Sequence, residues 1–286
     1  MKIIEPKVEL WQQGDDAKAH VARCARVCYG RERGNDQATI KRLITSKHWS
    51  MFRHESVYAI IPIYEKELEN YLLLVASCPY IQVHTYYNSV YIATNEQFIL
   101  DKSYPKFIEL INMYRVTEDE FSNTEIGFNM MRYTFCIDTQ ISTSRELNRV
   151  SPNNIAEMST RYVYEDGSIC RPHWMTDEEV DYLNNEPIFE EWCNSHKKAS
   201  IYRDSCNNSF NKYKLLVDIG MHRQDARGVL PLDTATRCVY TYSIDEWFDI
   251  IRKRVYNTTG KAHPNATIIC KIIEQELNGL GYEVKI

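Results

Sequence analysis

The sequence predicts a single α+β domain with a central, mostly antiparallel sheet flanked by helices. Helical and β-prone segments are interleaved irregularly, without the regular βαβ alternation of a doubly wound sheet. The 10 Gly residues are dispersed along the chain, and no stretch rich in Gly, Ser or Pro separates two halves as a linker would. Hydrophobic residues make up 44% of the 286 residues and charged residues 26%, as in ordinary globular domains that bury a core.

The first half of the chain predicts helices and strands in turn. Residues 15–29 carry small apolar side chains at helical spacing and are followed by Gly30, a residue suited to closing a helix. Asp36 is positioned to cap a second helix with an apolar face. Composition and spacing then predict a strand over 55–63, a helix over 65–76, a β-prone aromatic stretch over 80–91, a short helix over 105–114, a strand over 132–138 and the start of a helix over 142–149.

The second half predicts one long helix and then a strand followed by two helices. Aromatic and apolar side chains recur near helical spacing over residues 187–220, and Gly220 is a natural residue to follow the end of a helix. A β-branched strand is predicted over 234–242, and helices are predicted over 244–255 and 265–280.

Composition and charge exclude several classes of protein. No apolar run approaches the roughly 18 residues of a membrane span, and the N-terminal residues lack the apolar stretch and cleavage site of a signal peptide. The 34 basic and 39 acidic residues give a net charge of −5, which argues against duplex nucleic acid as the main partner. We therefore expect a cytoplasmic protein with no membrane or nucleic-acid partner.

The nine cysteines favour reduced, buried thiols over a disulfide framework. Their number is odd, their spacing is wide, and no CxxC pair is present. Cys24 and Cys28 are one helical turn apart and could share a metal, but no second Cys/His pair has the spacing of a zinc site. We therefore expect no metal site.

A cluster of arginines between residues 145 and 161 suggests anion binding. Arg145 and Arg149 stand four residues apart on one face of the predicted helix, and Arg161 follows within seventeen residues. Guanidinium groups donate paired hydrogen bonds to phosphate oxygens, so this pattern is typical of a phosphate clamp. Salt bridges to the neighbouring glutamates on a solvated helix face explain the same pattern equally well.

Three further segments, 48–54, 226–231 and 260–265, combine polar side chains with residues that shape the backbone. The chain has no GxGxxG and no GxxxxGK[ST] segment, so any dinucleotide is expected to bind without a Gly-rich helix N-terminus. Gly-x-Ser-x-Gly and His-Glu-x-x-His are also missing from the sequence.

Taken in order and over nearly the whole chain, these segments resemble the flavin-dependent thymidylate synthases. The stretches that carry the resemblance are Ala25-Arg26-Val27-Cys28-Tyr29, His48-Trp49-Ser50-Met51-Phe52-Arg53-His54, Ser144-Arg145-Glu146-Leu147-Asn148-Arg149, Glu157-Met158-Ser159-Thr160-Arg161-Tyr162, Ala226-Arg227-Gly228-Val229-Leu230-Pro231 and Lys261-Ala262-His263-Pro264. Residues 66–131 resemble an insertion that the longer members carry.

The resemblance implies a reaction and an assembly. It implies that dUMP is methylated at C5 to dTMP, with the one-carbon unit from methylenetetrahydrofolate, the hydride from reduced FAD, and NADPH as the reductant of the FAD. It also implies a homotetramer with active sites between subunits and no cysteine nucleophile.

The resemblance also assigns residues. Arg254 matches the arginine that polarises the uracil ring, where a fixed cation stabilises negative charge developing on N3 and O4. The positions that match nucleotide ligands are Glu146, Arg149, Glu157, Ser159, Arg161 and Arg227. The positions assigned to the flavin pocket or its support are His48, Ser50, His54, Arg149, Ser243 and Asn265.

The flavin side departs from the family pattern at several positions. Val150 and Ser151 stand where the signature has His and Arg, and Asp245 stands where the flavin element has Arg. Lys47 and Arg53 replace a Gly and a Glu. Because each lost charge-assisted hydrogen bond costs binding energy, we expect weak FAD binding unless Arg53 restores the missing positive charge.

Three other functions stay open. The first is a nucleotide-binding homologue with weakened or no flavin chemistry. The second is a relative that acts on another pyrimidine nucleotide. The third, from a different class, is a metal-dependent hydrolase that uses His48, His54 and Glu55.

Overall fold

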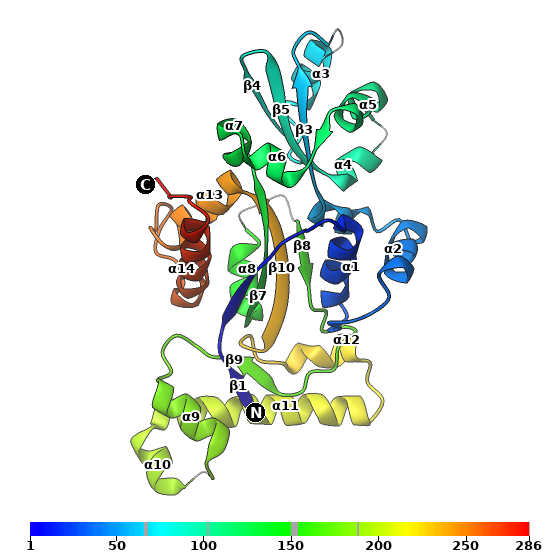
Figure 1. Cartoon of the computed structure of the whole chain (residues 1–286). Coiled ribbons are helices and arrows are strands. Elements are labelled where there is room, and N and C mark those ends of the chain that lie inside the picture. The colour runs from blue at the N-terminus through cyan, green and yellow to red at the C-terminus, as the bar shows by residue number, and fades with distance from the viewer. Residues whose placement is uncertain (66–67, 102, 150–153, 188, 286) are drawn as a thin grey trace.

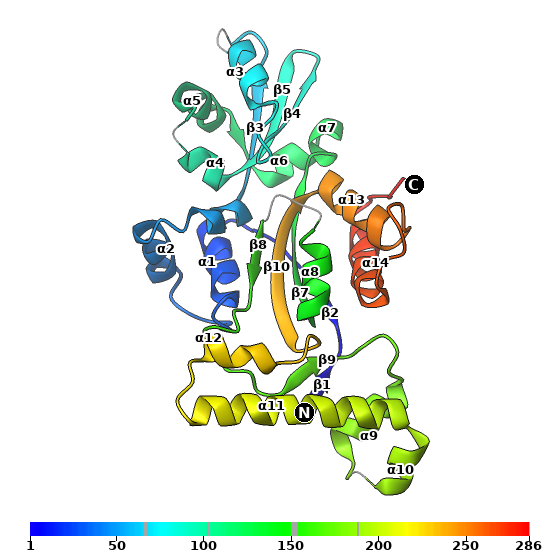
Figure 2. The same cartoon turned by 180° about the vertical axis from the view of Figure 1, so that it is seen from behind.

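The computed structural model describes residues 1–65, 68–101, 103–149, 154–187 and 189–285. Within these residues, two four-stranded antiparallel sheets and one parallel pair of strands are flanked by helices, which confirms the predicted α+β class. Figure 1 shows the three sheets one above another along the long axis of the molecule, and Figure 2 shows the same arrangement from behind.

The central sheet has the strand order β2-β7-β10-β8 and is antiparallel throughout. Strands β7 and β10 pair over their full length, with Cys238 opposite Ile137. Both were predicted from their β-branched and aromatic composition. The bounds are β2 (Lys7–Trp11), β7 (Arg132–Gln140), β8 (Ile155–Glu157) and β10 (Ala235–Ser243).

Helices cover both faces of the central sheet. Successive side chains of β7 point to opposite faces, and apolar side chains on each face pack against the helices there. Phe135 and Ile137 enter the core under α8 (Ile141–Leu147), α13 (Ile244–Arg254) and α14 (Pro264–Gly279). Cys136, on the opposite face, packs in a second cluster with residues of α1 (Ala17–Val27), and α2 (Asp36–Thr45) packs on α1.

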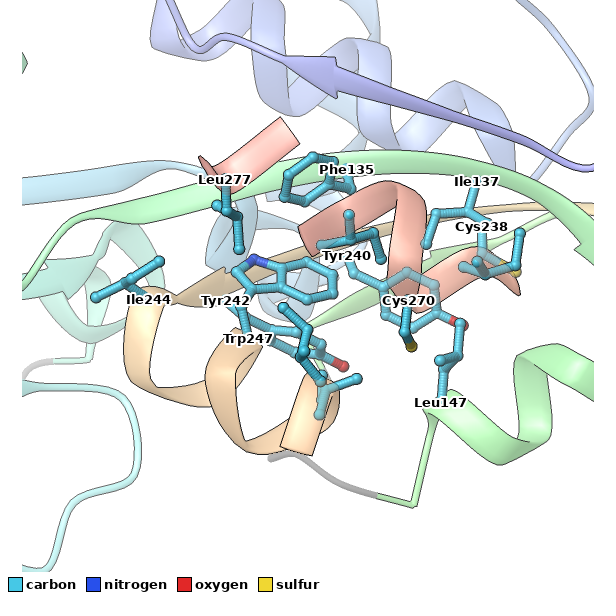
Figure 3. Close-up of a cluster of buried hydrophobic side chains, with 14 of the residues drawn as sticks. Phe135, Ile137, Leu147, Cys238, Tyr240, Tyr242, Ile244, Trp247, Cys270 and Leu277 are labelled. Atoms are coloured by element: carbon cyan, nitrogen blue, oxygen red, sulfur yellow. The ribbon is translucent and has the colours of Figure 1, made fainter. Parts of the chain in front are cut away.

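Trp247 lies at the centre of the larger core. Figure 3 shows it among the side chains of β7, β10 and the helices. Its ring centroid is 5.0 Å from those of Phe135 and of Tyr242, and its Nε1 donates to the carbonyl oxygen of Tyr133 at 3.0 Å. This packing fixes α13, and therefore the position of Arg254 at its end.

Most of the stretch expected to be an insertion folds together with β3 into the second sheet, of order β4-β5-β3-β6, around a core of its own. The β-prone segment 80–91 spans β4, the turn and the start of β5. The strands are β3 (Ser56–Pro62), β4 (Gln82–Tyr86), β5 (Ser89–Asn95) and β6 (Arg115–Val116), and the helices are α3 (Leu68–Val75), α4 (Glu96–Leu100), α5 (Pro105–Met113), α6 (Glu118–Ser122) and α7 (Glu125–Phe128).

The third layer joins β1 (Lys2–Ile4) in parallel to β9 (Ser168–Cys170). The long helix α11 crosses this end of the molecule in both views. The remaining elements are α9 (Asp177–Asn185), α10 (Glu190–Ser195), α11 (Lys197–Asp218), α12 (Arg223–Ala226) and the 3₁₀ helices η1 (Trp49–His54) and η2 (Arg227–Val229).

Two local predictions were wrong. The single helix predicted over 187–220 is two helices, because His196 has a non-helical backbone, with φ −118° and ψ 50°, between α10 and α11. The cap of α2 is Asn35, whose Oδ1 accepts from the backbone N–H of Ala38 at 2.8 Å. Asp36, predicted to be the cap, pairs with Arg26 instead.

Candidate functional site

Arg254 and Glu146 form the centre of one group of predicted site residues. The capping box of Ser243 and Glu246 begins α13, and three basic residues lie in its last turn, where the helix dipole favours cations. The guanidinium of Arg254 donates from Nε (3.2 Å) and Nη2 (2.5 Å) to the carbonyl oxygen of Glu146, and its Nη2 lies 3.7 Å from the Glu146 carboxylate. Arg149 reaches the same carboxylate at 3.4 Å.

An open cleft of about 420 Å³ lies beside this group. It is lined by Glu146, Arg149, Lys253, Arg254, Thr259, Gly260, Lys261 and Ala262. Of the four cationic side chains, Lys253 is paired with Asp249 at 2.5 Å. Arg149, Arg254 and Lys261 against the Glu146 carboxylate still give the cleft a positive balance, which suits an anionic ligand. The Arg149 side chain is 70% exposed, so its guanidinium is accessible to such a ligand.

A second group of predicted residues lies around α12 and η2. Arg227 donates from Nη1 to Thr160 Oγ1 and from Nε to the carbonyl oxygen of Gln224, both at 3.0 Å. Arg161 donates to Gln224 Oε1 at 3.3 Å, and its backbone N–H donates to Ser159 Oγ at 3.3 Å. Both arginines are exposed, so this group presents two guanidinium groups to solvent.

The two groups do not line one cleft within one chain. Among the described residues, the cleft beside Arg149 and Arg254 is lined by neither Arg161 nor Arg227, and by no residue of α12 or η2. The sequence named the arginines of both groups but missed Lys253, Thr160 and Gln224. Thr160 stands between Ser159 and Arg161 in a stretch that resembles the family, whereas nothing in the sequence indicated a role for Gln224 or Lys253.

Glu157 is half-buried and bridges α8 and β10. Its Oε1 accepts from Ser144 Oγ at 2.9 Å and from Thr236 Oγ1 at 3.3 Å. Burial raises the pKa of this carboxyl above its ordinary value. Glu157 therefore ties α8, the helix that precedes Arg149, to the sheet.

The predicted flavin residues on η1 have contrasting surroundings. His48 and Ser50 are exposed. His54 is fully buried, its Nδ1 lies 2.8 Å from Thr241 Oγ1, and burial lowers its pKa to about 3. Thr241 Oγ1 in turn lies 2.7 Å from Thr134 Oγ1, which lies 3.2 Å from His20 Nε2, so His54 belongs to a buried polar chain rather than to an accessible pocket.

Ser243 and Asn265 also use their polar groups within the chain. Ser243 is buried and caps α13 by accepting from the backbone N–H of Glu246 at 3.3 Å. Asn265 Oδ1 accepts from the backbone N–H of His173 at 2.8 Å and lies 3.1 Å from His173 Nδ1. Asn265 lines a separate cleft of about 350 Å³ with His173, His263 and other residues.

The departures on the flavin side are placed only in part. Val150 and Ser151 lie outside the described residues. Asp245 is exposed and accepts from Gln82 Nε2 at 3.4 Å, so its carboxylate faces β4. Arg53 donates to Gln97 and stacks over the ring of Tyr80, with its guanidinium carbon 4.5 Å from the ring centroid.

The metal-site alternative finds no support in the described part of the chain, where no three His, Cys, Asp or Glu side chains form a metal-binding group. Glu55 is instead paired with Lys18 at 2.7 Å and with Arg115 at 3.5 Å. The nine cysteines are free thiols, six of them buried and three partly buried.

A larger cavity of about 730 Å³ was not foreseen from the sequence. It lies between the N-terminal strand β2, the insertion and β7, and none of the predicted site residues lines it. Arg132 lines it while only 7% exposed, and donates weakly to the carbonyl oxygens of Arg53 and Thr241 at 3.4 and 3.5 Å. Separately, none of the helices in the described ranges is both long and apolar enough to cross a membrane.

Comparisons with known proteins identify the family. The family model described as thymidylate synthase complementing protein matches residues 122–278. Since this is more than half of the chain, the chain belongs to that family. The match includes both arginine groups and Ser243 and Asn265, whereas the 48–54 segment lies outside it.

Solved structures that are similar to the chain include two of the UMP/dUMP methylase PolB from Streptomyces cacaoi. The complex with 5-Br dUMP is 16% identical, covers 98% of this chain and 93% of that one, and has a TM-score of 0.47. The complex with 5-Br UMP is also 16% identical, covers 98% and 92%, and has a TM-score of 0.45. A likeness at this level does not define what this chain binds. No curated protein matches the chain.

Proposed function

We propose that the protein is a thymidylate synthase-type methyltransferase that converts dUMP to dTMP, with methylenetetrahydrofolate as the one-carbon donor, FAD as the cofactor and NADPH as its reductant. Membership of the thymidylate synthase complementing protein family supports the reaction class. The observation that carries the site is Arg254, held by two hydrogen bonds on the Glu146 carbonyl at the edge of a positively charged cleft.

The two arginine groups have different roles in this proposal. Arg254 stabilises the negative charge that develops on the uracil ring, because a guanidinium already oriented by the protein needs no reorganisation when the charge appears. Arg161 and Arg227, with Ser159, bind the phosphate through charge-assisted hydrogen bonds. Arg149 is accessible in the cleft of Arg254 and binds the nucleotide there.

We also propose that the active site is assembled between chains of a homotetramer. Among the described residues, the cleft that Arg149 and Arg254 line includes neither Arg161 nor Arg227. A single nucleotide can meet both groups if one chain supplies Arg254 and Arg149 and another supplies Arg161 and Arg227. This arrangement would also explain why, in the described part of one chain, the exposed Arg161 and Arg227 donate to the neutral groups of Gln224 and Thr160.

The fit of the described residues to a flavin is partial. When bound, FAD supplies the hydride that completes the methyl group. Arg149, His48 and Ser50 have accessible polar atoms and can contact its phosphates or ring. His54, Ser243 and Asn265 are buried, and their hydrogen bonds are made within the chain. We therefore propose that these three support the fold, and that FAD binds more weakly than the nucleotide does.

The internal hydrogen bonds of His54, Ser243 and Asn265 also favour a second candidate, a nucleotide-binding homologue with little flavin chemistry. The two candidates differ in one experiment. The purified chain is given dUMP, methylenetetrahydrofolate, NADPH and excess FAD, and the product is followed by mass spectrometry. Formation of dTMP supports the methyltransferase. Tight dUMP binding by calorimetry with no dTMP at saturating FAD supports the binding protein and contradicts the proposed reaction.

A further inference from the structure

The outer face of α11 is apolar at both ends and has no partner in the described part of the chain. Ile201 is 67% exposed and Leu215 is 54% exposed, and Ile219, just past the helix, is 79% exposed. The buried side of α11, with Phe210 and Tyr213, faces the rest of the molecule. At about 100° per residue, Ile201, Asn208 and Leu215 lie within about 40° of one another, on the side opposite these buried residues. These exposed apolar side chains point away from the core and are available to contact another molecule.

The side chains on this face are arranged symmetrically about Asn208. Four residues before Asn208 stands Asp204, and four residues after it stands Lys212. Seven residues before it stands Ile201, and seven after it stands Leu215. At ten residues the pair is Lys198 and Asp218. At these three distances an acid matches a base and an aliphatic residue matches an aliphatic one, whereas at eleven residues Ile219 is matched by Lys197.

This pattern is the one that an antiparallel pair of identical helices requires. When two copies of α11 cross at Asn208, Asp204 of one copy lies at the same level as Lys212 of the other, about 6 Å from the crossing point, and the symmetric contact repeats it. Ile201 meets Leu215 in the same way about 10 Å from the crossing point. In a parallel pair Asp204 would face Asp204 and Lys212 would face Lys212, so like charges would oppose that arrangement.

The side chains are available for these contacts. The Asp204 side chain is 61% exposed and pairs with its neighbour Arg203, and Lys212 is exposed. Asn208 is exposed at the centre, where its amide can bond with the same amide of a second copy, as a central Asn fixes the register of coiled coils.

We propose that α11 forms a two-fold interface with α11 of a second copy of this chain, antiparallel and centred on Asn208, with Ile201 packed on Leu215 and Asp204 paired with Lys212. The occupant of this face is therefore another identical chain. The inference rests on the symmetry of the exposed face and not on the proposed reaction, so it stands or falls independently of catalysis.

A cross-link at the centre tests the geometry of the proposed pair. Only a residue on the two-fold axis meets its own copy, so Asn208→Cys should form an intermolecular disulfide under mild oxidation of the full chain. The matched control is Lys214→Cys, which is also exposed but lies on another side of the helix. The expected result is a covalent dimer on a non-reducing gel for Asn208→Cys, well above the level in the wild type and in Lys214→Cys. Equal cross-linking in all three proteins overturns the proposed centre.

A charge exchange tests the register. Asp204→Lys should weaken the association measured by sedimentation equilibrium about three- to thirtyfold, because two lysines then face each other twice, and Lys212→Asp should weaken it similarly. The double variant should recover most of the wild-type association. Ile201→Asp with Leu215→Asp should remove this association step altogether, while circular dichroism and the melting temperature confirm that the chain is folded. A double charge variant that associates no better than the single variants, or a wild type that stays monomeric at tens of micromolar, overturns the proposal.

Discussion

The guanidinium of Arg254 donates two hydrogen bonds to the carbonyl oxygen of Glu146, which lies 108 residues earlier in the chain. One anchor is therefore a main-chain atom of α8, which no substitution of the Glu146 side chain removes. The Glu146 carboxylate, 3.7 Å from Arg254 and 3.4 Å from Arg149, adds charge to the site but is not the only group that orients the arginine.

The first prediction separates these two contributions. Arg254→Ala should lower kcat for dTMP formation about 10²- to 10³-fold, the usual cost of removing one fixed group that stabilises transition-state charge. Glu146→Gln should leave Arg254 in place, because the carbonyl contacts persist, and should change kcat much less. Steady-state kinetics of both variants provide the measurement. A loss in Glu146→Gln as large as that in Arg254→Ala would mean that the carboxylate itself meets the substrate.

The second prediction concerns the phosphate. Arg161→Ala should weaken the binding of uridine monophosphates about tenfold or more, since a charge-assisted hydrogen bond contributes roughly 1.5–3 kcal/mol. Isothermal titration calorimetry measures the affinity. Arg33→Ala, which removes an exposed arginine outside both groups, is the control and should bind as the wild type does. Unchanged affinity in Arg161→Ala would return this arginine to a structural role with Gln224.

The third prediction follows from the buried histidines. Burial lowers the pKa of His20 to about 4 and that of His54 to about 3, both below the ordinary value of 6.5. Below pH 6.5 the unfolded chain therefore binds protons that the folded chain does not, and stability falls as the pH falls toward these values. Each histidine adds a slope of up to about 1.4 kcal/mol per pH unit.

Urea unfolding between pH 7 and pH 4 provides the test of this slope. His20→Gln should be less stable than the wild type at pH 7 and should lose less further stability on acidification. The exposed His84 offers a control, and His84→Gln should have the wild-type slope. If the stability of His20→Gln falls with pH as steeply as that of the wild type, the pKa of His20 is not lowered in the folded chain.

The fourth prediction concerns the cofactor. The purified protein should contain less than one FAD per chain, because Val150 and Ser151 lack the charge of the family's His and Arg, and because Arg53 already contacts Gln97 and Tyr80. Val150→His with Ser151→Arg should raise FAD affinity, measured by flavin absorbance and fluorescence titration, with little change in dUMP affinity. A full complement of tightly bound FAD in the unmodified protein would show that other residues supply the missing charge.

Much of the fold could be predicted because its largest elements carry strong local patterns. Strands β7 and β10 are rich in β-branched and aromatic residues, and α14 has a regular apolar stripe. Composition located the two strands, and apolar spacing located the helix, to within a few residues. Strands of two to five residues, such as β1, β6 and β8, carry too few side chains for a period to be visible, and only pairing with distant strands defines them.

The break at His196 and the roles of the buried polar residues could not be read from the sequence. Apolar spacing continues across His196, so periodicity cannot reveal the change in its backbone angles. His54, Ser243 and Asn265 match polar positions of a family motif, but whether such a group faces a ligand or the core depends on residues far away in the chain. By contrast, the arginines assigned to the nucleotide lie at exposed or cleft positions in the structure. This could be expected, because an unpaired charge is costly to bury.

Transfer of the methylene carbon to dUMP tests the proposed reaction directly. The chain is incubated with dUMP, NADPH, excess FAD and methylenetetrahydrofolate that carries an isotope label in its methylene group, and the nucleotide is analysed by mass spectrometry. Labelled dTMP should form with the wild type and be nearly absent with Arg254→Ala. The wild-type protein is first shown by calorimetry to be saturated with dUMP. If unlabelled dUMP is then the sole nucleotide recovered, the proposed reaction is contradicted.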